Sequence, residues 1–372
     1  MGALIMLGFQ ECCDTYFYRE AGQICWVRGW SSCWNEIRPL GSTLLNALMY
    51  PYTLARLSHL LLLGFSFYML AIEQQEGSLG QKNGICQISW LFGMTNKHCA
   101  ISIKTLLKVL GAFLLLEFMF MGLASVNLTD VPAGVFAAIA IIGFYRKTAL
   151  LFALAAGASV LIRAAYLYPM LVMVAYFIVE SLYKKSGRKA AISFLFFLCL
   201  APQYWLTYQH IGVFSFLDPS KVEYWRNVHF SSNFSGYDTL IPAAGHPWPS
   251  GATLGLAAAF EQRQWGDLIK LFASRVDFYF ASFVPLGKAY LSAARERIFS
   301  PVVFLLHGAA FVFSYLYLKV KIGAWRIWIP LSIILTQSLL IIPEQRFIFV
   351  IQLFLVMGTY LYFIRIIEKK AV

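Results

Sequence analysis

Charged residues are scarce in this sequence. They make up 13% of its 372 residues, whereas a soluble domain of this size carries roughly a quarter. Hydrophobic residues make up 59%, and the mean hydropathy is +0.66. The period-2 alternation typical of an outer-membrane barrel is also absent. Several apolar runs instead approach the roughly 20 residues that a helix needs to cross a bilayer. The sequence therefore predicts an all-α, polytopic transmembrane protein.

A metal-binding arrangement of cysteines is missing as well. The chain has seven cysteines, and four of them fall in its first polar segment: Cys12, Cys13, Cys25 and Cys33. Their spacing matches no zinc pattern, so no metal site is predicted. If this segment faces an oxidising compartment, it allows one disulfide, with Cys25 and Cys33 as the candidate pair.

No nucleic-acid-binding module accompanies the net charge of +12. The basic residues lie between apolar runs, at 146–147, 184–189, 319–326 and 365–370. The positive-inside rule places these clusters on the cytoplasmic side. Segments 11–55 and 207–300 then face outward, and the N-terminus faces inward. The charge is therefore attributed to membrane topology, and no nucleic-acid partner is expected.

Nine apolar runs and a short lead-in before Glu11 predict about ten spans. The nine runs are 56–72, 103–126, 131–145, 148–162, 167–183, 191–206, 301–318, 327–342 and 347–364. The lead-in is about half the length of a span, so its helix is either short and shielded by protein, or its natural start lies upstream. The run "ICQISWLFGM" is too short to cross and is interpreted as interfacial or re-entrant.

These spans divide the chain into three parts. Residues 1–206 form an N-terminal transmembrane core, which contains the first outward loop at 11–55. Residues 207–300 form a large outward loop. In that loop the apolar spacing over 264–283 predicts an amphipathic helix, on the outer leaflet or at the start of a further span. Residues 301–372 form the C-terminal transmembrane helices.

Ionisable and polar side chains gather on the predicted outer side. They are Glu11, Asp14, Arg38, Asp130, Arg163, His246, Arg295, Arg297, Glu344 and Arg346. Each has a purely structural interpretation: Arg163 as a snorkelling side chain, Asp130 as the N-cap of a helix that starts at Val131, and Glu344 with Arg346 as a surface pair. As a one-sided group, they indicate chemistry at the outer interface.

Transport predicts a different placement of charge, near the membrane midplane between helices. Within the predicted spans, Glu117 and Glu180 are the clear ionisable exceptions. The outer cluster therefore favours chemistry on a lipid head group over passage through the membrane.

Five short segments, in this order, carry a resemblance to a known family. They are "DTYFYREAG", "RPLGSTLLNALMYP", "LTDVPAG", "LFALAAGASVLIRAAYLYP" and "PEQRFIFVIQLF". Together they resemble the GT-C superfamily of integral-membrane glycosyltransferases, including the bacterial dolichyl-phosphate-mannose type, the aminoarabinose-transferase type and the O-antigen-modifying enzymes. The chain departs from the family in its short lead-in. It also departs in its first acids, because Glu11 stands three residues before Asp14 rather than beside it.

The resemblance implies a sugar donor linked to polyprenyl phosphate and an acceptor that is a glycan or a lipid-linked glycan. It places the catalytic base on Asp14, with Asp130 as the second catalytic candidate. The residues implied in substrate binding are Glu11, Tyr16, Tyr18, Arg38, Arg163, His246, Glu344 and Arg346. A divalent cation is compatible with the reaction but not demanded by it. The implied location is a bacterial inner membrane, with the active site facing the periplasm.

Three alternatives stay open at the level of sequence. The first is a glycan polymerase or ligase with a similar outward site. The second is a transporter or lipid-linked sugar flippase, which predicts that Glu117 and Glu180 are essential and Asp14 is dispensable. The third is a multispan scaffold, which predicts that no outward charge matters.

Overall fold

The computed structural model is helical throughout most of the chain that it describes. The described residues are 14–36, 38–48, 54–77, 103–124, 129–231, 254–280, 282–283, 298–299, 301–321, 327–340 and 348–370. The strands found among them are β1 (Ser282–Phe283) and β2 (Ile298–Phe299), a two-residue antiparallel pair with Ser282 opposite Phe299. The all-α fold class is thus confirmed.

Two short helices form the centre of the molecule. α6 (Asp130–Tyr145) and α7 (Ala149–Ile162) pack against each other, and most of their side chains are buried. Their sequences are rich in alanine and glycine, so the two backbones approach closely: a Cβ added to Gly143 would lie 3.1 Å from the Phe152 nitrogen. Protein surrounds α6 on several sides, which makes a helix of 16 residues tolerable at membrane depth.

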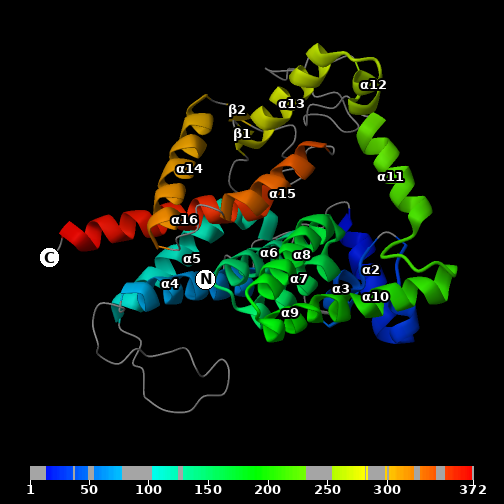
Figure 1. The fold of residues 1–372 in the computed structure, drawn as a ribbon. Coiled ribbons are helices and arrows are strands. Elements are labelled where there is room, and N and C mark those ends of the chain that lie inside the picture. The colour runs from blue at the N-terminus through cyan, green and yellow to red at the C-terminus, as the bar shows by residue number, and fades with distance from the viewer. Residues whose placement is uncertain are drawn as a thin grey trace.

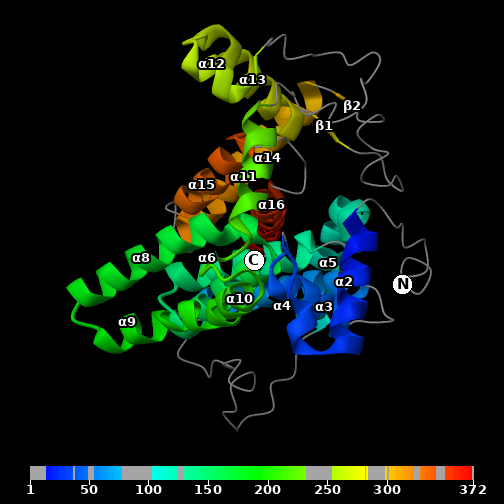
Figure 2. The same ribbon diagram turned by 90° about the vertical axis from the view of Figure 1, so that its right-hand side faces the viewer.

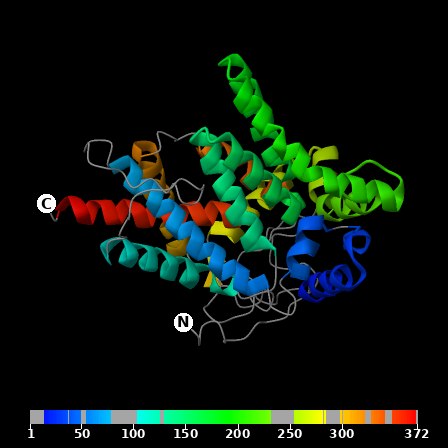
Figure 3. The same ribbon diagram turned by 90° about the horizontal axis from the view of Figure 1, so that it is seen from below.

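Other helices surround this pair (Figure 1). α8 (Leu167–Tyr183), α9 (Gly187–Ser193) and α10 (Leu195–Ile211) follow α7 in the chain and pack on it. α4 (Leu54–Gly77), α5 (Ile103–Ala124) and α16 (Phe349–Lys370) lie next to one another on the face seen from below (Figure 3). All three pack on α6, which joins the C-terminal helix to the N-terminal core.

Four helical stretches in the described residues are long and apolar enough to cross a membrane. They are Ala164–Tyr183, Gly187–Ile211, Pro301–Leu318 and Phe349–Glu368. Four shorter apolar helices, Arg56–Ile72, Asp130–Tyr145, Ala149–Ile162 and Trp328–Leu340, accompany them. The chain therefore has the helices of a membrane protein, while the number of ten spans stays a prediction. The lead-in and the run at 85–94 lie outside the described residues.

The predicted outward segment rises away from the central helices (Figure 2). α11 (Pro219–Ser231) leads from α10 towards α12 (Leu256–Glu261) and α13 (Trp265–Phe280). α14 (Pro301–Lys321) and α15 (Trp328–Leu340) follow, and α14 packs along α16. The predicted amphipathic helix is present as α13.

α13 is fastened to the end of α15 by two buried side chains. Arg275 Nη1 donates to the Leu339 carbonyl at 2.5 Å, and the Tyr279 hydroxyl donates to the Ser338 carbonyl at 3.1 Å. These carbonyls belong to the last described turn of α15. Burial lowers the pKa of Arg275 to about 10. α13 is thus packed against other helices of the protein.

The first polar segment folds as a helical hairpin beside α7. It consists of α2 (Asp14–Arg28), a 3-10 turn η1 (Trp30–Cys33) and α3 (Leu40–Leu48). α3 touches α7 through Gly41, where an added Cβ would lie 2.7 Å from the Leu161 carbonyl oxygen. The glycine of "RPLG" therefore permits close contact between α3 and α7, next to Arg163.

Candidate functional site

An ion pair joins the first residue of α6 to the residue that follows α7. Arg163, which immediately follows α7, pairs through Nη1 with Oδ1 of Asp130, the first residue of α6. The Asp130 side chain is 1% exposed and that of Arg163 is 12% exposed. Thr129 is the N-cap residue of α6, so the interpretation of Asp130 as an N-cap is wrong. Snorkelling is likewise excluded for Arg163, because its guanidinium turns inward to a buried carboxylate.

Tyr18 connects this pair to Arg38. Its hydroxyl accepts hydrogen bonds from Arg38 Nη1 at 3.0 Å and from the Thr129 hydroxyl at 3.2 Å. The Arg38 guanidinium also lies 4.6 Å from the centre of the Tyr18 ring, at cation–π distance. Tyr18 is 4% exposed. Three predicted site regions, "DTYFY", "RPLG" and "LTD", therefore meet at one buried tyrosine.

The next turn of α6 closes the apolar side of the site. Gly134 lies against the Phe349 ring, and an added Cβ there would lie 3.4 Å from the Tyr166 hydroxyl. Tyr166 and Phe349 are both buried. Since a side chain at position 134 would collide with them, glycine allows these two rings to pack one turn below Asp130.

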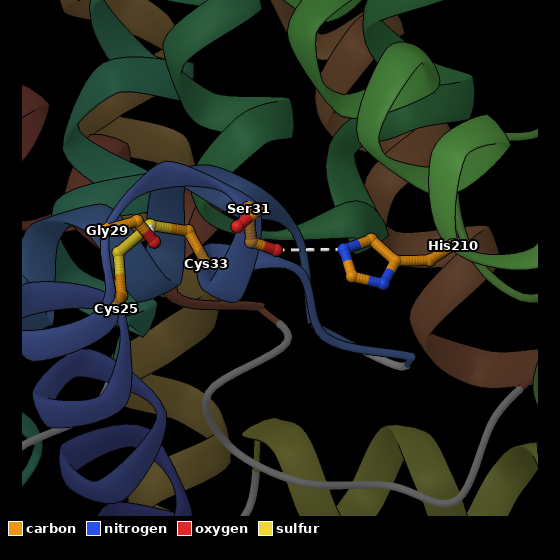
Figure 4. The surroundings of a disulfide bond; sticks show 5 residues. All are labelled: Cys25, Gly29, Ser31, Cys33 and His210. Carbon is orange, nitrogen blue, oxygen red and sulfur yellow. Dashed lines mark hydrogen bonds between the residues drawn. A yellow bond between two sulfur atoms is a disulfide. The ribbon is translucent and has the colours of Figure 1, made fainter.

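A disulfide closes the turn between α2 and η1, and it joins the two cysteines named as the candidate pair (Figure 4). Cys25 bonds to Cys33, and Gly29 between them has φ +85°, which favours glycine. In the same turn the Ser31 carbonyl lies 2.8 Å from His210 Nε2 at the end of α10. The disulfide loop is therefore attached to the core through α10.

An apolar groove of about 700 Å³ lies between α8 and α15. Its lining includes Tyr168, Trp328, Ile333, Gln337 and Leu340. At one end Gln337 Nε2 donates to the Ala165 carbonyl at 2.8 Å, two residues beyond Arg163. The groove lining is thus hydrogen-bonded to a residue that lies two positions after Arg163 in the sequence. Its size suits part of a lipid chain or another elongated apolar ligand.

The two acids within predicted spans have basic or imidazole partners. His59 Nδ1 lies 2.7 Å from Glu117 Oε2, between α4 and α5. Glu180 pairs with Lys147 and, at 2.6 Å, with Lys184. Both lysines belong to basic clusters that the sequence places on the cytoplasmic side, so Glu180 lies at that end of α8 rather than at its middle.

Several predicted site residues lie outside what the structure describes. Asp14 begins α2, but its side chain and that of Tyr16 are not among the described ones. The same holds for Glu11, His246, Glu344, Arg346, Arg295 and Arg297 in full. Among the residues that are described, no three His, Cys, Asp or Glu side chains gather closely enough to hold a metal ion. A divalent cation and the roles of the undescribed residues stay predictions.

Sequence reasoning missed four residues that complete the site. Thr129 and Tyr166 lie beside the Asp130–Arg163 pair. Gln203 and Thr207 form hydrogen bonds to the segment that carries Arg38. Gln203, Thr207 and His210 follow one another at helical spacing on α10. These residues could have been predicted from the sequence, because they form a polar stripe on an otherwise apolar helix.

Comparisons with protein-family models, curated proteins and solved structures find no match for this chain.

Proposed function

We propose that this protein is a membrane glycosyltransferase of the GT-C type. In this proposal it moves a sugar from a polyprenyl-phosphate donor to a surface glycan or a lipid-linked acceptor at the outer face of a bacterial inner membrane. The observation that carries the proposal is the Asp130–Arg163 pair, joined through Thr129 and Tyr18 to Arg38. It gathers residues from four of the five segments on which the family resemblance depends.

The proposed reaction assigns a separate task to each charged group. The acceptor hydroxyl attacks the anomeric carbon, its proton passes to the Asp14 carboxylate, and the bond between that carbon and the phosphate oxygen breaks. The leaving group is a lipid phosphate. In this proposal Arg38 and Arg163 donate charge-assisted hydrogen bonds to it. Asp130 orients Arg163 and is the alternative base.

The remaining assignments follow from this reaction. Glu11, Tyr16, Tyr18, His246, Glu344 and Arg346 are the proposed substrate-binding residues. The groove between α8 and α15 has the size and apolar lining to accept part of the isoprenoid chain. A disulfide in residues 25–33 suits an oxidising compartment, which supports a periplasmic orientation for that loop.

The transporter alternative finds less support. Transport calls for ionisable groups near the midplane between helices, whereas Glu180 contacts two lysines at one end of α8. Glu117, which contacts His59 between α4 and α5, is the residue on which this alternative depends. A polymerase or ligase shares the outward site, and the two differ in product: a ligase adds a preassembled chain, whereas the proposed enzyme adds one sugar.

An Asp14→Asn variant tests the proposal, with Glu20→Gln as the matched control. Glu20 lies on the same helix and is exposed. Sugar incorporation into the surface glycan of the host is measured, along with the amount of protein in the membrane. We expect Asp14→Asn to abolish incorporation and Glu20→Gln to leave it unchanged. If Asp14→Asn retains full incorporation, Asp14 is not the base, and Asp130→Asn becomes the deciding variant. Loss of whole chains rather than single sugars identifies a ligase.

A further inference from the structure

One face of α10 holds the segment that carries Arg38. Gln203, Thr207 and His210 are spaced by four and three residues, so they project from the same side of the helix. All three contact residues 31–40. The Gln203 and Thr207 side chains are almost completely buried, at 1% and 0% exposed, so their polar groups depend on protein partners.

Gln203 makes three hydrogen bonds, which account for most of what its amide offers. Its Oε1 accepts from the Leu40 backbone nitrogen at 2.5 Å. Its Nε2 donates to the Phe216 carbonyl at 2.7 Å and to the Thr207 hydroxyl at 3.2 Å. The Leu40 nitrogen is one of the first amides of α3 and lacks a partner within that helix. Gln203 therefore anchors the start of α3, two residues after Arg38.

Thr207 and His210 hold the preceding part of the same segment. Trp34 Nε1 donates to the Thr207 hydroxyl at 3.3 Å. The Trp34 ring stacks on His210, with ring centres 4.6 Å apart and planes 9° apart. His210 also contacts the Ser31 carbonyl. One ring face of Trp34 is thus covered by the His210 ring, and Trp34 attaches the segment to α10.

Arg38 lies between these fastening points. Its backbone nitrogen donates to Asn35 Oδ1 at 3.0 Å, and its guanidinium reaches Tyr18. The turn that follows α10 is attached to the segment as well. The Asp218 nitrogen donates to the Glu36 carbonyl at 3.2 Å, and Lys221 lies 3.3 Å from the Glu36 carboxylate. Contacts to α10 and to the start of α11 therefore restrict Arg38 on both sides in the chain.

We infer that Gln203 is a positioning residue for Arg38: by holding the start of α3, it sets the guanidinium at the height where a lipid phosphate binds. This inference rests on the proposed function. It predicts that Gln203 contributes to phosphate binding through Arg38 and by no other route. A Gln203 substitution should then weaken binding only while Arg38 is present, which a double-mutant cycle measures directly.

The experiment uses the purified full-length protein in detergent, with farnesyl phosphate as the probe. Dissociation constants are measured for the wild type, Gln203→Leu, Arg38→Ala and the double variant. We expect Arg38→Ala to weaken binding by about tenfold or more, as for the loss of a charge-assisted hydrogen bond. We expect Gln203→Leu to weaken it by a smaller factor, and the double variant to bind like Arg38→Ala alone.

Two further measurements separate positioning from general damage. Hydrogen exchange measures the protection of the Leu40 amide, which should exchange faster in Gln203→Leu than in the wild type. Thr359→Val is the matched control, because it removes another hydrogen bond between helices, from Thr359 to the Ala310 carbonyl at 3.1 Å, far along the chain from Arg38. It should leave the affinity unchanged. If Gln203→Leu does not accumulate in membranes, Thr207→Val takes its place in the cycle.

The outcomes decide both proposals separately. If the wild type binds farnesyl phosphate and Arg38→Ala weakens binding, but Gln203→Leu matches the wild type, the positioning role is wrong while the proposed function stands. Additive effects of the two substitutions also contradict the positioning role. If the wild type does not bind the probe, or binds it no better than farnesol, the proposed function falls and this inference with it.

Discussion

The Arg163 guanidinium lies against the Asp130 carboxylate, and both groups are almost completely removed from solvent. The pair joins the C-terminal end of α7 to the first residue of α6. A carboxylate at a helix N-terminus also interacts favourably with the helix dipole. The ion pair thus stabilises the contact between the two central helices, as well as orienting Arg163.

Removing one member of this pair should destabilise the protein strongly. Asp130→Asn or Arg163→Gln leaves a buried charge without its counter-charge, which costs about 3–5 kcal/mol. Thermal unfolding in detergent measures the loss. Lys184→Gln is the control: it removes one of two lysines beside Glu180, and its side chain is 62% exposed, so its effect should be small. Unfolding of both site variants at the wild-type temperature would contradict the buried ion pair.

Gly41→Ala should push α3 away from α7. The added Cβ would lie 2.7 Å from the Leu161 carbonyl oxygen, and such overpacking costs about 1–3 kcal/mol. Gly64→Ala is the matched helical control, because nothing lies within 4 Å of its Cβ position; it should stabilise the protein by up to about 1 kcal/mol. Both are measured as shifts in unfolding temperature, and equal shifts in the same direction would refute the close contact.

Loss of the disulfide should destabilise the hairpin of α2 and α3. Cys25 and Cys33 lie eight positions apart in the sequence, and closing a loop of this length stabilises a fold by about 2.5 kcal/mol. We expect the Cys25→Ser, Cys33→Ser double variant to unfold at lower temperature, while Cys199→Ser, which removes a free thiol, changes little. Mass spectrometry of alkylated protein checks the premise: alkylation of Cys25 without prior reduction would show that the bond is absent.

Filling the groove should affect long-chain donors selectively. Ile333→Trp places a large ring between α8 and α15. An isoprenoid chain that can no longer bury two CH₂ groups there loses about 0.8 kcal/mol of binding free energy for each, or roughly tenfold in affinity. Transfer from a long polyprenyl-phosphate donor is compared with transfer from a farnesyl donor. Leu305→Trp is the control, on an exposed part of α14 outside the groove lining. Equal effects on both donors would place the isoprenoid elsewhere.

The stability of the first turn of α11 should decrease at acid pH, because the Asp218 carboxylate becomes protonated. The Ser220 hydroxyl and backbone nitrogen donate to Asp218 Oδ1, at 2.7 and 2.9 Å, and lower the pKa of this carboxyl. Its folded-state pKa therefore lies below the unfolded value of about 3.9. The stabilisation is complete above that pH and is lost as the pH falls through the folded-state pKa.

Hydrogen exchange in the first turn of α11 measures this effect. Asp218→Ala should raise exchange there at neutral pH, because a helix N-cap is lost, whereas Glu223→Gln on the same helix should not. Acidification below the folded-state pKa of Asp218 should remove the difference between wild type and Asp218→Ala. A difference that persists at low pH would show that the carboxylate charge is not its source.

Much of the local structure follows from the pattern of residues alone. The apolar runs became helices close to their expected bounds, as at Asp130–Tyr145 for the run 131–145. The apolar spacing of α13 and the pairing of Cys25 with Cys33 were also predictable, because both depend on neighbours within a few turns of chain. The burial of Arg275 against the end of α15 was not, since helical periodicity identifies a face but not what covers it.

By itself, the sequence determined that the chain is helical and apolar and that its ionisable groups collect towards one predicted side, because composition and periodicity are properties of short segments. Only the tertiary structure decided which of those groups meet. Tyr18 reaches Thr129 across 111 residues and Gln203 reaches Leu40 across 163. Those contacts depend on how closely α3, α6, α7 and α10 pack, which Gly41 and the buried hydrogen bonds set in three dimensions.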